Sequence, residues 1–352
     1  MNLDDIRIFP NLDSQNMMAE IEALPQQLLD AWHLGQNLPL HEWSGIERVL
    51  LVGMGSSALG ADLLAAYAAP NCAVPSAVHR DYDLPAWVQG SQTLVVVISH
   101  SGNTEESLTA FDRAIAQDCR VLVISSGGVL VEKARQGDSH VWRYAYDGPP
   151  RMAIGYVFGL LLALFHRLKL IPAPEAELQN AVAAMRKQQT ELLADVPLMK
   201  NPAKRLAGQC MQRWIIVIGA GILTPVARRW KEQINTTAKS WAQLECLPEA
   251  NHATMMGVNH PEGALAHTMA LFLRARSIHP RNQQRVDLTK EYFMLEGMGT
   301  DFVNAQGDSP LAEMWTLLHF GEYLAYYLAI ACRENPAAVM AIDGMKQYLS
   351  AK

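Results

Sequence analysis

The sequence has few charged residues and no strongly basic region. Asp, Glu, Lys and Arg make up 18% of the 352 residues, and the net charge is 29 − 35 = −6, with both signs mixed along the chain. Nucleic-acid binding requires a concentrated basic face, so this distribution argues against nucleic acid as a partner. Half of the residues are hydrophobic, which is typical of a well-buried globular protein and excludes a disordered or coiled-coil chain.

Paired cysteines, a signal peptide and a membrane-length apolar run are also missing. The five cysteines are scattered, odd in number and never in a CxxC pair, as is typical of reduced thiols in a cytosolic protein. Residues 1–15 carry acidic side chains where a signal peptide needs a basic flank and an apolar core. The longest apolar stretch, residues 152–165, is shorter than the roughly 20 residues that a membrane span requires. We therefore expect a cytoplasmic protein without a membrane span, in which residues 152–165 form a buried helix.

Strand-like and helix-like segments alternate in the first half of the chain. Apolar runs typical of buried strands occupy residues 49–52, 73–80, 93–99 and 120–126. Apolar residues at helical spacing predict helices over residues 14–33 and about 104–117. Parallel strands need crossover connections, which helices provide, so this alternation predicts a doubly wound, mostly parallel sheet.

The same scheme restarts after a proline-rich segment, residues 170–179, which we interpret as a linker. Residues 213–234 predict a strand, a turn that contains Gly219 and Gly221, and a helix. Two final helices are predicted over about 311–331 and 336–349.

The expected fold class is therefore α/β, with two doubly wound domains flanked by helices. A chain of 352 residues is too long for one ordinary core, which supports the division. We expect the first domain to cover residues 1–172 and the second to cover residues 173–352.

The segment "SHSGNTEES", Ser99 to Ser107, places small, donor-rich residues where a buried strand ends and a helix begins. At the carboxyl end of a parallel sheet, such a turn presents unpaired backbone N–H groups and the positive end of the helix dipole. Ser99, Ser101 and Thr104 add hydroxyl donors, and Gly102 lets the backbone curl around an oxyanion. The segment therefore predicts a phosphate site.

A helix cap is the alternative interpretation of this segment. Asn103 with Glu106 three residues later fits a capping box, in which the two side chains satisfy the first N–H groups of a helix. That interpretation leaves Ser99, Ser101 and Gly102 without a role, so we favour the anion site.

The turn "GMGSSALG" after the first strand also has two interpretations. The spacing of Gly53 and Gly55 matches a dinucleotide fingerprint, and Arg80 would suit a nucleotide 2′-phosphate, which would indicate an NADP-dependent oxidoreductase. However, Ser56 and Ser57 put hydroxyls where a pyrophosphate site uses bare backbone. Two hydroxyl-rich turns from neighbouring strands better suit one compact phosphomonoester.

Six motifs follow one another along the chain: "GMGSSALGADLL", "SHSGNTEESL", "GPPRMAIGYVFGLLL", "RRWKEQINTTAK", "LPEANH" and "GEYLAYYLAIACRENPAAVMAIDGMKQYL". Together they resemble the bifunctional phosphoglucose/phosphomannose isomerase family, from about Val49 to the C-terminus. The resemblance implies two sugar isomerase (SIS) subdomains and a homodimer. It also implies interconversion of glucose 6-phosphate, mannose 6-phosphate and fructose 6-phosphate without a metal or organic cofactor.

The resemblance further implies roles for individual residues. The substrate phosphate would be held by Gly55, Ser56, Ser57, Ser99, Ser101, Gly102, Asn103 and Thr104. Arg151 would stabilise the enediolate, a task suited to an always-charged planar donor, and His252 and Lys346 would handle ring opening. In the family the histidine reaches the neighbouring subunit's site. Ordinary roles stay open for these three residues: an ion-pair partner, one of eleven histidines, and a solvated lysine.

The carbon base of the family is missing from this sequence. The family pattern is Asn-Glu-Asn-Ala-Lys, with the glutamate as base, whereas this chain has Thr236 at the glutamate position in "NTTAK". A threonine hydroxyl is too weakly acidic to act as a general base near neutral pH. Glu232 lies four positions earlier on the same helix face and is a candidate substitute, although we favour its interpretation as a solvated surface charge next to Arg228 and Lys231. Glu245 and Glu249 are the next carboxylates along the chain.

A metal site is a further alternative, because His252, His260 and His267 fall within a short stretch. Their spacing suits neither one helix face nor a zinc loop, so we expect no metal. The second function left open is a non-catalytic sugar-phosphate-binding protein, acting as a sensor or a partner subunit.

Overall fold

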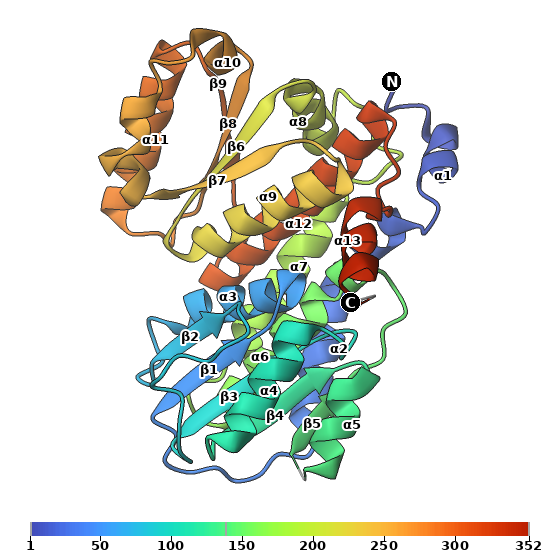
Figure 1. Ribbon diagram of the computed structural model, residues 1–352. Coiled ribbons are helices and arrows are strands. Elements are labelled where there is room, and N and C mark those ends of the chain that lie inside the picture. Colours follow the sequence, from blue (N-terminus) through green and yellow to red (C-terminus); the bar gives the residue numbers. More distant parts are fainter. Residues whose placement is uncertain (1, 138, 351–352) are drawn as a thin grey trace. The chain divides into compact units, whose positions relative to one another are not determined.

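Nine strands form two separate parallel sheets in the computed structural model, which describes residues 2–137 and 139–350 (Figure 1). The contacts divide the chain into two units. Unit 1 consists of Met1–Glu22, Ala184–Asp308 and Glu313–Lys352, and unit 2 of Ala23–Ala183 and Ser309–Ala312. The predicted α/β class with two doubly wound sheets is confirmed. The expected domain boundary at residues 172 and 173 stays a prediction, and the contact-based units divide near residue 183 instead.

Unit 2 contains a five-stranded sheet in the order β2-β1-β3-β4-β5, with every neighbouring pair parallel. Its strands are β1 (Arg48–Val52), β2 (Ser76–His79), β3 (Thr93–Ile98), β4 (Arg120–Ser125) and β5 (His140–Arg143). All six residues of the central strand β3 are buried, as its unbroken apolar run predicts for a strand covered on both faces.

Helices cover both faces of this sheet (Figure 1). One face carries α4 (Glu105–Ala116) and α5 (Gly128–Gln136), whose apolar residues Phe111 and Leu130 pack on Val95 and Val123 of the sheet. The helices of the other face are α2 (Met17–Asn37), α3 (Gly55–Ala68) and α6 (Ile154–Arg167). The predicted buried helix is α6, in which every residue from Val157 to Phe165 is buried. Because α3 and α6 pack closely, a Cβ at Gly60 would lie 2.5 Å from Val157.

Unit 1 contains a four-stranded parallel sheet in the order β7-β6-β8-β9. Its strands are β6 (Trp214–Ala220), β7 (Ala242–Leu247), β8 (Thr268–Arg274) and β9 (Gly299–Asn304). The helix α9 (Thr224–Thr237) packs on β6 and β7, and α11 (Pro280–Leu295) packs on β8 and β9. The Trp230 indole of α9 donates to the Leu317 carbonyl of α12 (Pro310–Cys332) at 2.8 Å, which joins these two helices.

The remaining helical elements are short or lie between the strands. They are η1 (Ile6–Ile8), α1 (Phe9–Leu12), η2 (Pro150–Met152), α7 (Glu175–Gln189), α8 (Pro202–Cys210), η3 (Gly221–Leu223), η4 (Glu249–His252), η5 (Thr254–Gly257), α10 (Glu262–Ala266), α12 (Pro310–Cys332) and α13 (Met340–Ser350). No helix among the described residues is long and apolar enough to cross a membrane.

Some elements differ from the sequence predictions. The expected linker over residues 170–179 is only partly correct, because α7 begins at Glu175, directly after Pro174. Proline is favoured at the start of a helix, where its missing N–H costs nothing. The sequence pattern does not predict β5, β7 and β9. Each is an outer strand whose residues are mostly half-buried, so none carries a continuous apolar run.

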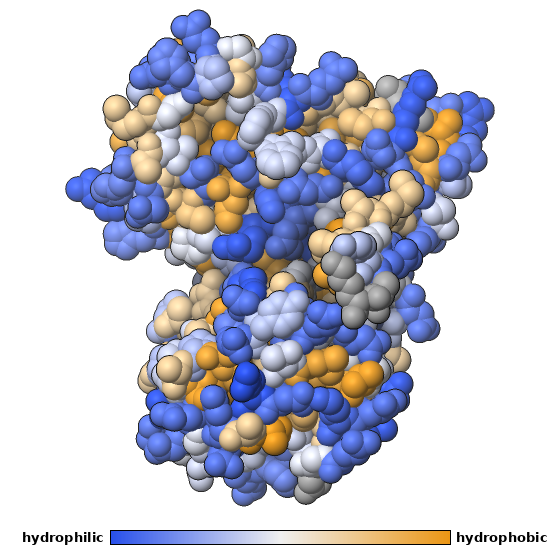
Figure 2. Space-filling view, in the orientation of Figure 1, coloured by the Kyte–Doolittle hydropathy of each residue, from blue (hydrophilic) through white to orange (hydrophobic). Residues whose placement is uncertain are grey.

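The last helix, α13, is exposed along its length. Residues 341–349 are all exposed, among them Met345, which is 59% exposed, and the preceding Met340 is 82% exposed. In Figure 2 pale and orange side chains lie at the surface where Figure 1 draws this helix. In the single chain this helix therefore exposes apolar side chains to solvent.

Candidate functional site

The two predicted phosphate turns lie side by side at the carboxyl edge of the sheet in unit 2. The strand order β2-β1-β3-β4-β5 reverses between β1 and β3, and ligands of open α/β sheets bind at such a switch point. One turn follows β1 and the other follows β3, which are hydrogen-bonded neighbours. At Gly53 a Cβ would lie 2.9 Å from the Ile98 carbonyl oxygen, which shows how closely the two chain segments approach.

The turn after β1 presents the start of helix α3. Gly55 has φ +50°, and nothing lies within 4 Å of the place where its Cβ would be, so glycine serves the backbone conformation here. Ser56 is half-buried and Ser57 is buried. Because α3 begins at Gly55 without a side-chain cap, its first N–H groups and the positive end of its dipole face this turn.

The turn after β3 is held by its own hydroxyls. The Ser99 hydroxyl donates to Thr104 Oγ1 at 3.2 Å and accepts from the Gly102 N–H at 3.2 Å. The hydroxyl of the exposed Ser101 accepts from the Asn103 N–H at 3.2 Å. Gly102 has φ +67°, and a Cβ there would lie 1.8 Å from the Gly127 carbonyl oxygen, so only glycine fits. The turn is therefore preorganised, with Ser101 at its surface.

The alternative interpretation of this segment, a capping box of Asn103 and Glu106, is wrong. Thr104 precedes α4 without a side-chain cap, and Asn103 Oδ1 instead accepts from the Val129 N–H of α5 at 3.0 Å. The loop Ser126–Gly128 after β4 is thus a support that the sequence interpretation missed. The Ser126 hydroxyl donates to the His100 carbonyl at 2.6 Å, which fixes the two loops together. The signal in the sequence was a second Ser-Gly-rich turn, "SSGG", directly after a buried strand.

His100 lies between the two serines of the same turn. Its Nδ1 is 3.0 Å from the Tyr144 hydroxyl, and burial lowers the pKa of the imidazole. The ring is therefore neutral near neutral pH. The donors at this edge are then hydroxyls and backbone amides, and His100 adds no positive charge.

Arg151 and Arg80 are the two arginines of unit 2 that were candidates for ligand binding, and their surroundings in the structure differ. Arg151 is half-buried in η2, which packs against α3, the helix that begins at the first phosphate turn. Arg80 instead pairs with Asp62 of α3, so its guanidinium is already engaged. The strand order is also the one seen in flavodoxin-like sheets rather than in dinucleotide-binding halves. The structure therefore gives no support to the suggested 2′-phosphate role of Arg80.

Thr236, at the position of the family glutamate, lies in the last turn of α9 in unit 1. Its hydroxyl donates to the Glu232 carbonyl at 2.7 Å and lies 3.3 Å from Gln233 Oε1. A local bond of this kind satisfies the hydroxyl within its own helix and gives it no basic character. The half-buried Glu232 side chain lies one turn earlier on the same face.

Next to Thr236, a buried polar cluster joins α9 to α12. Arg229 Nε donates to Glu322 Oε1 at 2.6 Å, and the Gln233 amide donates to the other oxygen of the same carboxylate. Arg229 and Glu322 are each 1% exposed. The sequence interpretation missed Glu322, although a single carboxylate inside the apolar run "GEYLAYYLAIA" is a recognisable signal, since buried charges are rare unless paired.

His252 and Thr236 lie at opposite ends of the sheet in unit 1. The helix α9 follows β6 at the carboxyl edge and leads into β7 at the amino edge, where Asn235 Oδ1 accepts from the Ala242 N–H at 2.8 Å. His252 is exposed in η4, just past the carboxyl end of β7. A helix of 14 residues is about 21 Å long, so the structure does not bring these two residues together within one unit.

Of the other candidates of unit 1, Glu249 shares η4 with His252, and Glu245 is bonded to Thr254, two residues past it, whereas Lys346 lies on α13. Lys346 is exposed on α13, and the chain before that helix is fixed near Thr236, because Lys239 Nζ donates to the Asn335 carbonyl. Glu245 accepts from the Thr254 hydroxyl at 2.7 Å on β7. Among the described residues, no group of three His, Cys, Asp or Glu side chains could hold a metal ion, so the three-histidine alternative has no structural basis.

Comparison with known proteins gives the family. Residues 199–349 match the model described as the bacterial phospho-glucose isomerase C-terminal SIS domain. A bifunctional phosphoglucose/phosphomannose isomerase of Caldicellulosiruptor bescii is 34% identical over 336 residues, which is 95% of this chain and 99% of that protein. The chain belongs to the bifunctional phosphoglucose/phosphomannose isomerase family. A second member, from Aquifex aeolicus, is 30% identical and covers 78% of this chain and 81% of its own length.

The fold of this family member also matches solved structures. A hypothetical protein from Thermus thermophilus aligns with a TM-score of 0.74 at 16% identity, covering 98% of this chain and 92% of that one. The family resemblance seen in the six motifs is therefore confirmed.

Proposed function

We propose that this protein interconverts glucose 6-phosphate or mannose 6-phosphate with fructose 6-phosphate, with low turnover. The observation that carries the proposal is the pair of hydroxyl-rich turns at the β1/β3 switch point of a chain that belongs to this isomerase family. Family membership supports the reaction class. The hydroxyl of Thr236, bonded within its own helix, supports the reduced rate.

The substrate phosphate is assigned to the two turns of unit 2. Direct contacts are assigned to the backbone and hydroxyls of Gly55, Ser56, Ser57, Ser99, Ser101, Gly102 and Thr104. Asn103 holds the second turn against α5, so we assign it a positioning role. Hydroxyls, backbone amides and the start of α3 and α4 together suit a dianionic phosphomonoester without a metal ion.

The reaction transfers one proton between C2 and C1 of the open-chain sugar. A base removes the C2 proton of the aldose, and negative charge develops on the C1 oxygen. The proton of the C2 hydroxyl then passes to the C1 oxygen, and the base returns its proton to C1, which gives the ketose. We assign Arg151 to the developing oxyanion, and His252 and Lys346 to ring opening. Glu232 is the substitute carbon base to be tested, because it lies on the same helix face as Thr236.

We further propose that the protein works as a cytoplasmic homodimer. His252 is too far from Thr236 along unit 1 for both to serve one site of a single chain, which supports a role for His252 of a second copy. The exposed apolar side chains of α13 are consistent with burial in such an assembly. The five free cysteines support a reducing compartment.

The test measures the exchange of the transferred C1 and C2 hydrogens with solvent. Wild-type protein is incubated with fructose 6-phosphate in D2O, and deuterium at C1 and C2 is followed by NMR beside a coupled assay for glucose 6-phosphate. Slow exchange with slow product formation supports a weak isomerase. Binding of fructose 6-phosphate without any exchange would favour the second candidate, a non-catalytic sugar-phosphate-binding protein, whose supporting observation is Thr236 itself.

A further inference from the structure

The side chain of His252 has no anchor of its own in unit 1. His252 is exposed at the end of η4, and its imidazole makes no hydrogen bond or ion pair with any residue that the structure describes. A catalytic group must be held close to one geometry, and a displacement of about 1 Å can cost roughly 10²-fold in rate. The orientation of His252 therefore depends on what holds the backbone of η4.

Asn251, the residue directly before His252, bonds η4 to the helix α11. Its Oδ1 accepts from Arg285 Nη1 at 2.9 Å, and its Nδ2 donates to Thr289 Oγ1 at 2.7 Å. Arg285 and Thr289 lie four positions apart and so share one face of α11. Thr289 is only 1% exposed, so these bonds join an exposed turn to the buried side of a helix.

The Asn251 amide can satisfy these partners in one orientation only. The Arg285 guanidinium donates and cannot accept, so it must face the amide oxygen. The Thr289 hydroxyl donates its proton to the Arg285 carbonyl at 2.6 Å, so it can only accept from the amide nitrogen. The same nitrogen lies 3.0 Å from Met255 Sδ, a weak acceptor. Asn251 therefore cannot turn without losing hydrogen bonds.

A second bond holds the chain on the other side of His252. The Thr254 hydroxyl donates to Glu245 Oε2 of β7 at 2.7 Å. Ala250, two residues before His252, is buried. His252 is thus carried by a short segment that is bonded to α11 before the histidine and to β7 after it.

We propose that Asn251 is a positioning residue for His252, and that Arg285 and Thr289 act through Asn251. Because ring opening by His252 belongs to the proposed function, the positioning role rests on that function. It gives a task to α11, a helix that contains none of the candidate residues. Loss of this contact should lower kcat and leave the KM for fructose 6-phosphate unchanged, since the phosphate turns of unit 2 are not altered.

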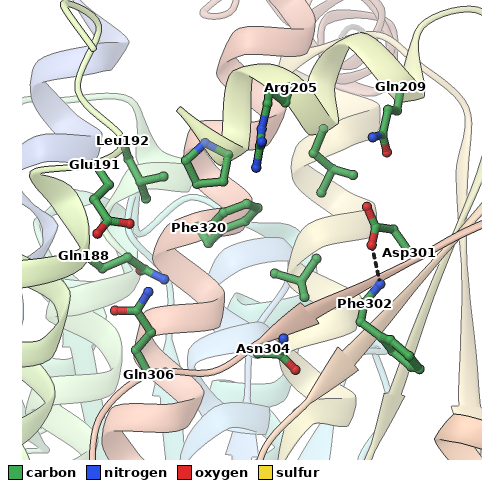
Figure 3. Close-up of a pocket in the computed structure, with 13 residues that line it drawn as sticks. Gln188, Glu191, Leu192, Arg205, Gln209, Asp301, Phe302, Asn304, Gln306 and Phe320 are labelled. Carbon is green, nitrogen blue, oxygen red and sulfur yellow. Dashed lines mark hydrogen bonds between the residues drawn. The ribbon is translucent and has the colours of Figure 1, made fainter. Parts of the chain in front are cut away.

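The kinetic test uses the full chain and the coupled assay for glucose 6-phosphate. Asn251→Ala should lower kcat about tenfold. Thr289→Val keeps the shape of the side chain but removes one of the two bonds and should lower kcat about threefold, whereas Thr289→Ser should retain the wild-type kcat. Arg285→Ala should also lower kcat. Its control is Arg205→Ala, an exposed arginine of α8 beside β9, the strand at the opposite edge of the sheet from β7 (Figure 3).

A double-mutant cycle separates positioning of His252 from a general loss of structure. Asn251→Ala should cause no further loss of rate in the His252→Gln background, because the group through which it acts is already missing. Deuterium exchange at C1 of fructose 6-phosphate measures rates that are too low for the coupled assay. Equal losses in both backgrounds, or an unchanged kcat in Asn251→Ala, would overturn the proposal.

A structural measurement distinguishes failure of the anchoring from failure of the proposed function. Absence of turnover in wild type, or wild-type turnover in His252→Gln, would contradict the role of His252 and not its anchoring. Hydrogen–deuterium exchange of residues 249–257, followed by mass spectrometry, should be about tenfold faster in Asn251→Ala than in wild type and unchanged in Arg205→Ala. Equal exchange in wild type and Asn251→Ala would show that the bonds to α11 do not hold η4.

Discussion

The two sheets begin with the same turn but differ in what the turn presents. The first central strand of each unit ends in Gly-x-Gly, and the second glycine has a positive φ, +50° at Gly55 in unit 2 and +56° at Gly221 in unit 1. Two serines follow Gly55, whereas Ile222 and Leu223 follow Gly221. The backbone geometry is thus repeated, while the pair of hydroxyls directly after the second glycine occurs in unit 2 and not in unit 1.

The neighbouring loops differ in a second way. In unit 2 the loop after β3 keeps Ser101 at the surface. In unit 1 the loop after β8 is already occupied by a carboxylate, since the backbone N–H groups of Arg276 and Ser277 each donate to Glu313 at 2.9 Å. Glu313 is 3% exposed. The loop of unit 1 therefore holds an internal anion, whereas we expect the loop of unit 2 to receive an external one.

The largest effect should come from restoring a carboxylate to unit 1. If Thr236 leaves the site without a carbon base, Thr236→Glu should raise the rate of C1 deuterium exchange in fructose 6-phosphate by about 10²- to 10⁴-fold, the usual contribution of a general base. The matched variant Thr236→Gln, whose side chain has the size of glutamate without its charge, should leave this exchange rate unchanged. Full wild-type turnover that disappears in Glu232→Gln would instead show that Glu232 is the base. If turnover survives that change, Glu245 and Glu249 are next to be tested.

The role of the unit 2 hydroxyls in phosphate binding can be tested by comparison with Thr224, the hydroxyl at the corresponding helix start of unit 1. Ser101→Ala with Thr104→Ala should weaken hexose 6-phosphate binding more than tenfold by calorimetry, because each donor to a charged group is worth roughly 1.5–3 kcal/mol. Thr224→Ala, a hydroxyl loss at the corresponding helix start of unit 1, should leave affinity unchanged. Equal affinity in all three proteins would show that the phosphate binds elsewhere.

Unit 1 should also be the more acid-sensitive unit, because of His319. This residue is fully buried on α12, burial lowers its pKa to about 4, and its Nε2 lies 2.8 Å from the Ile21 carbonyl. In the unfolded chain the pKa of this imidazole is near 6.5. Between pH 6.5 and pH 4 the unfolded chain therefore binds a proton that the folded chain does not, so the free energy of unfolding falls as the pH drops through this range.

The full cost of charging His319 is about 3 kcal/mol. Urea unfolding of wild type and of His319→Gln at several pH values in this range measures the cost. The free energy of unfolding should depend less steeply on pH in the variant than in wild type. The same pH dependence of the free energy of unfolding in both proteins would mean that the His319 imidazole is not held neutral in the folded state.

The smallest effect is expected from opening the occupied loop of unit 1. Glu313→Ala removes the acceptor of two backbone N–H groups and should lower the free energy of unfolding by about 2 kcal/mol. Inorganic phosphate should then raise the melting temperature of the variant more than that of wild type, while Glu313→Gln should respond little. An identical phosphate response in wild type and Glu313→Ala would contradict the equivalence of the two loops.

Sequence patterns located the two hydroxyl-rich turns because each is continuous in the chain. Buried apolar runs fix β1 and β3, and the residues directly after them carry the hydroxyls and glycines. The same patterns could not locate β5, β7 and β9, whose half-buried residues resemble loop sequence. Nor could they show that Asn103 supports α5 rather than α4, since both interpretations use the same local residues.

The sequence alone therefore determined the fold class, the two hydroxyl-rich turns and the family, because each of these depends on motifs whose residues are neighbours in the chain. The tertiary structure decided the rest. It paired Glu322 with Arg229, filled the β8 loop with Glu313, and placed Thr236 and His252 at opposite ends of one sheet. These relations join residues up to 93 positions apart, and only the packing of helices on strands brings such residues together or holds them apart.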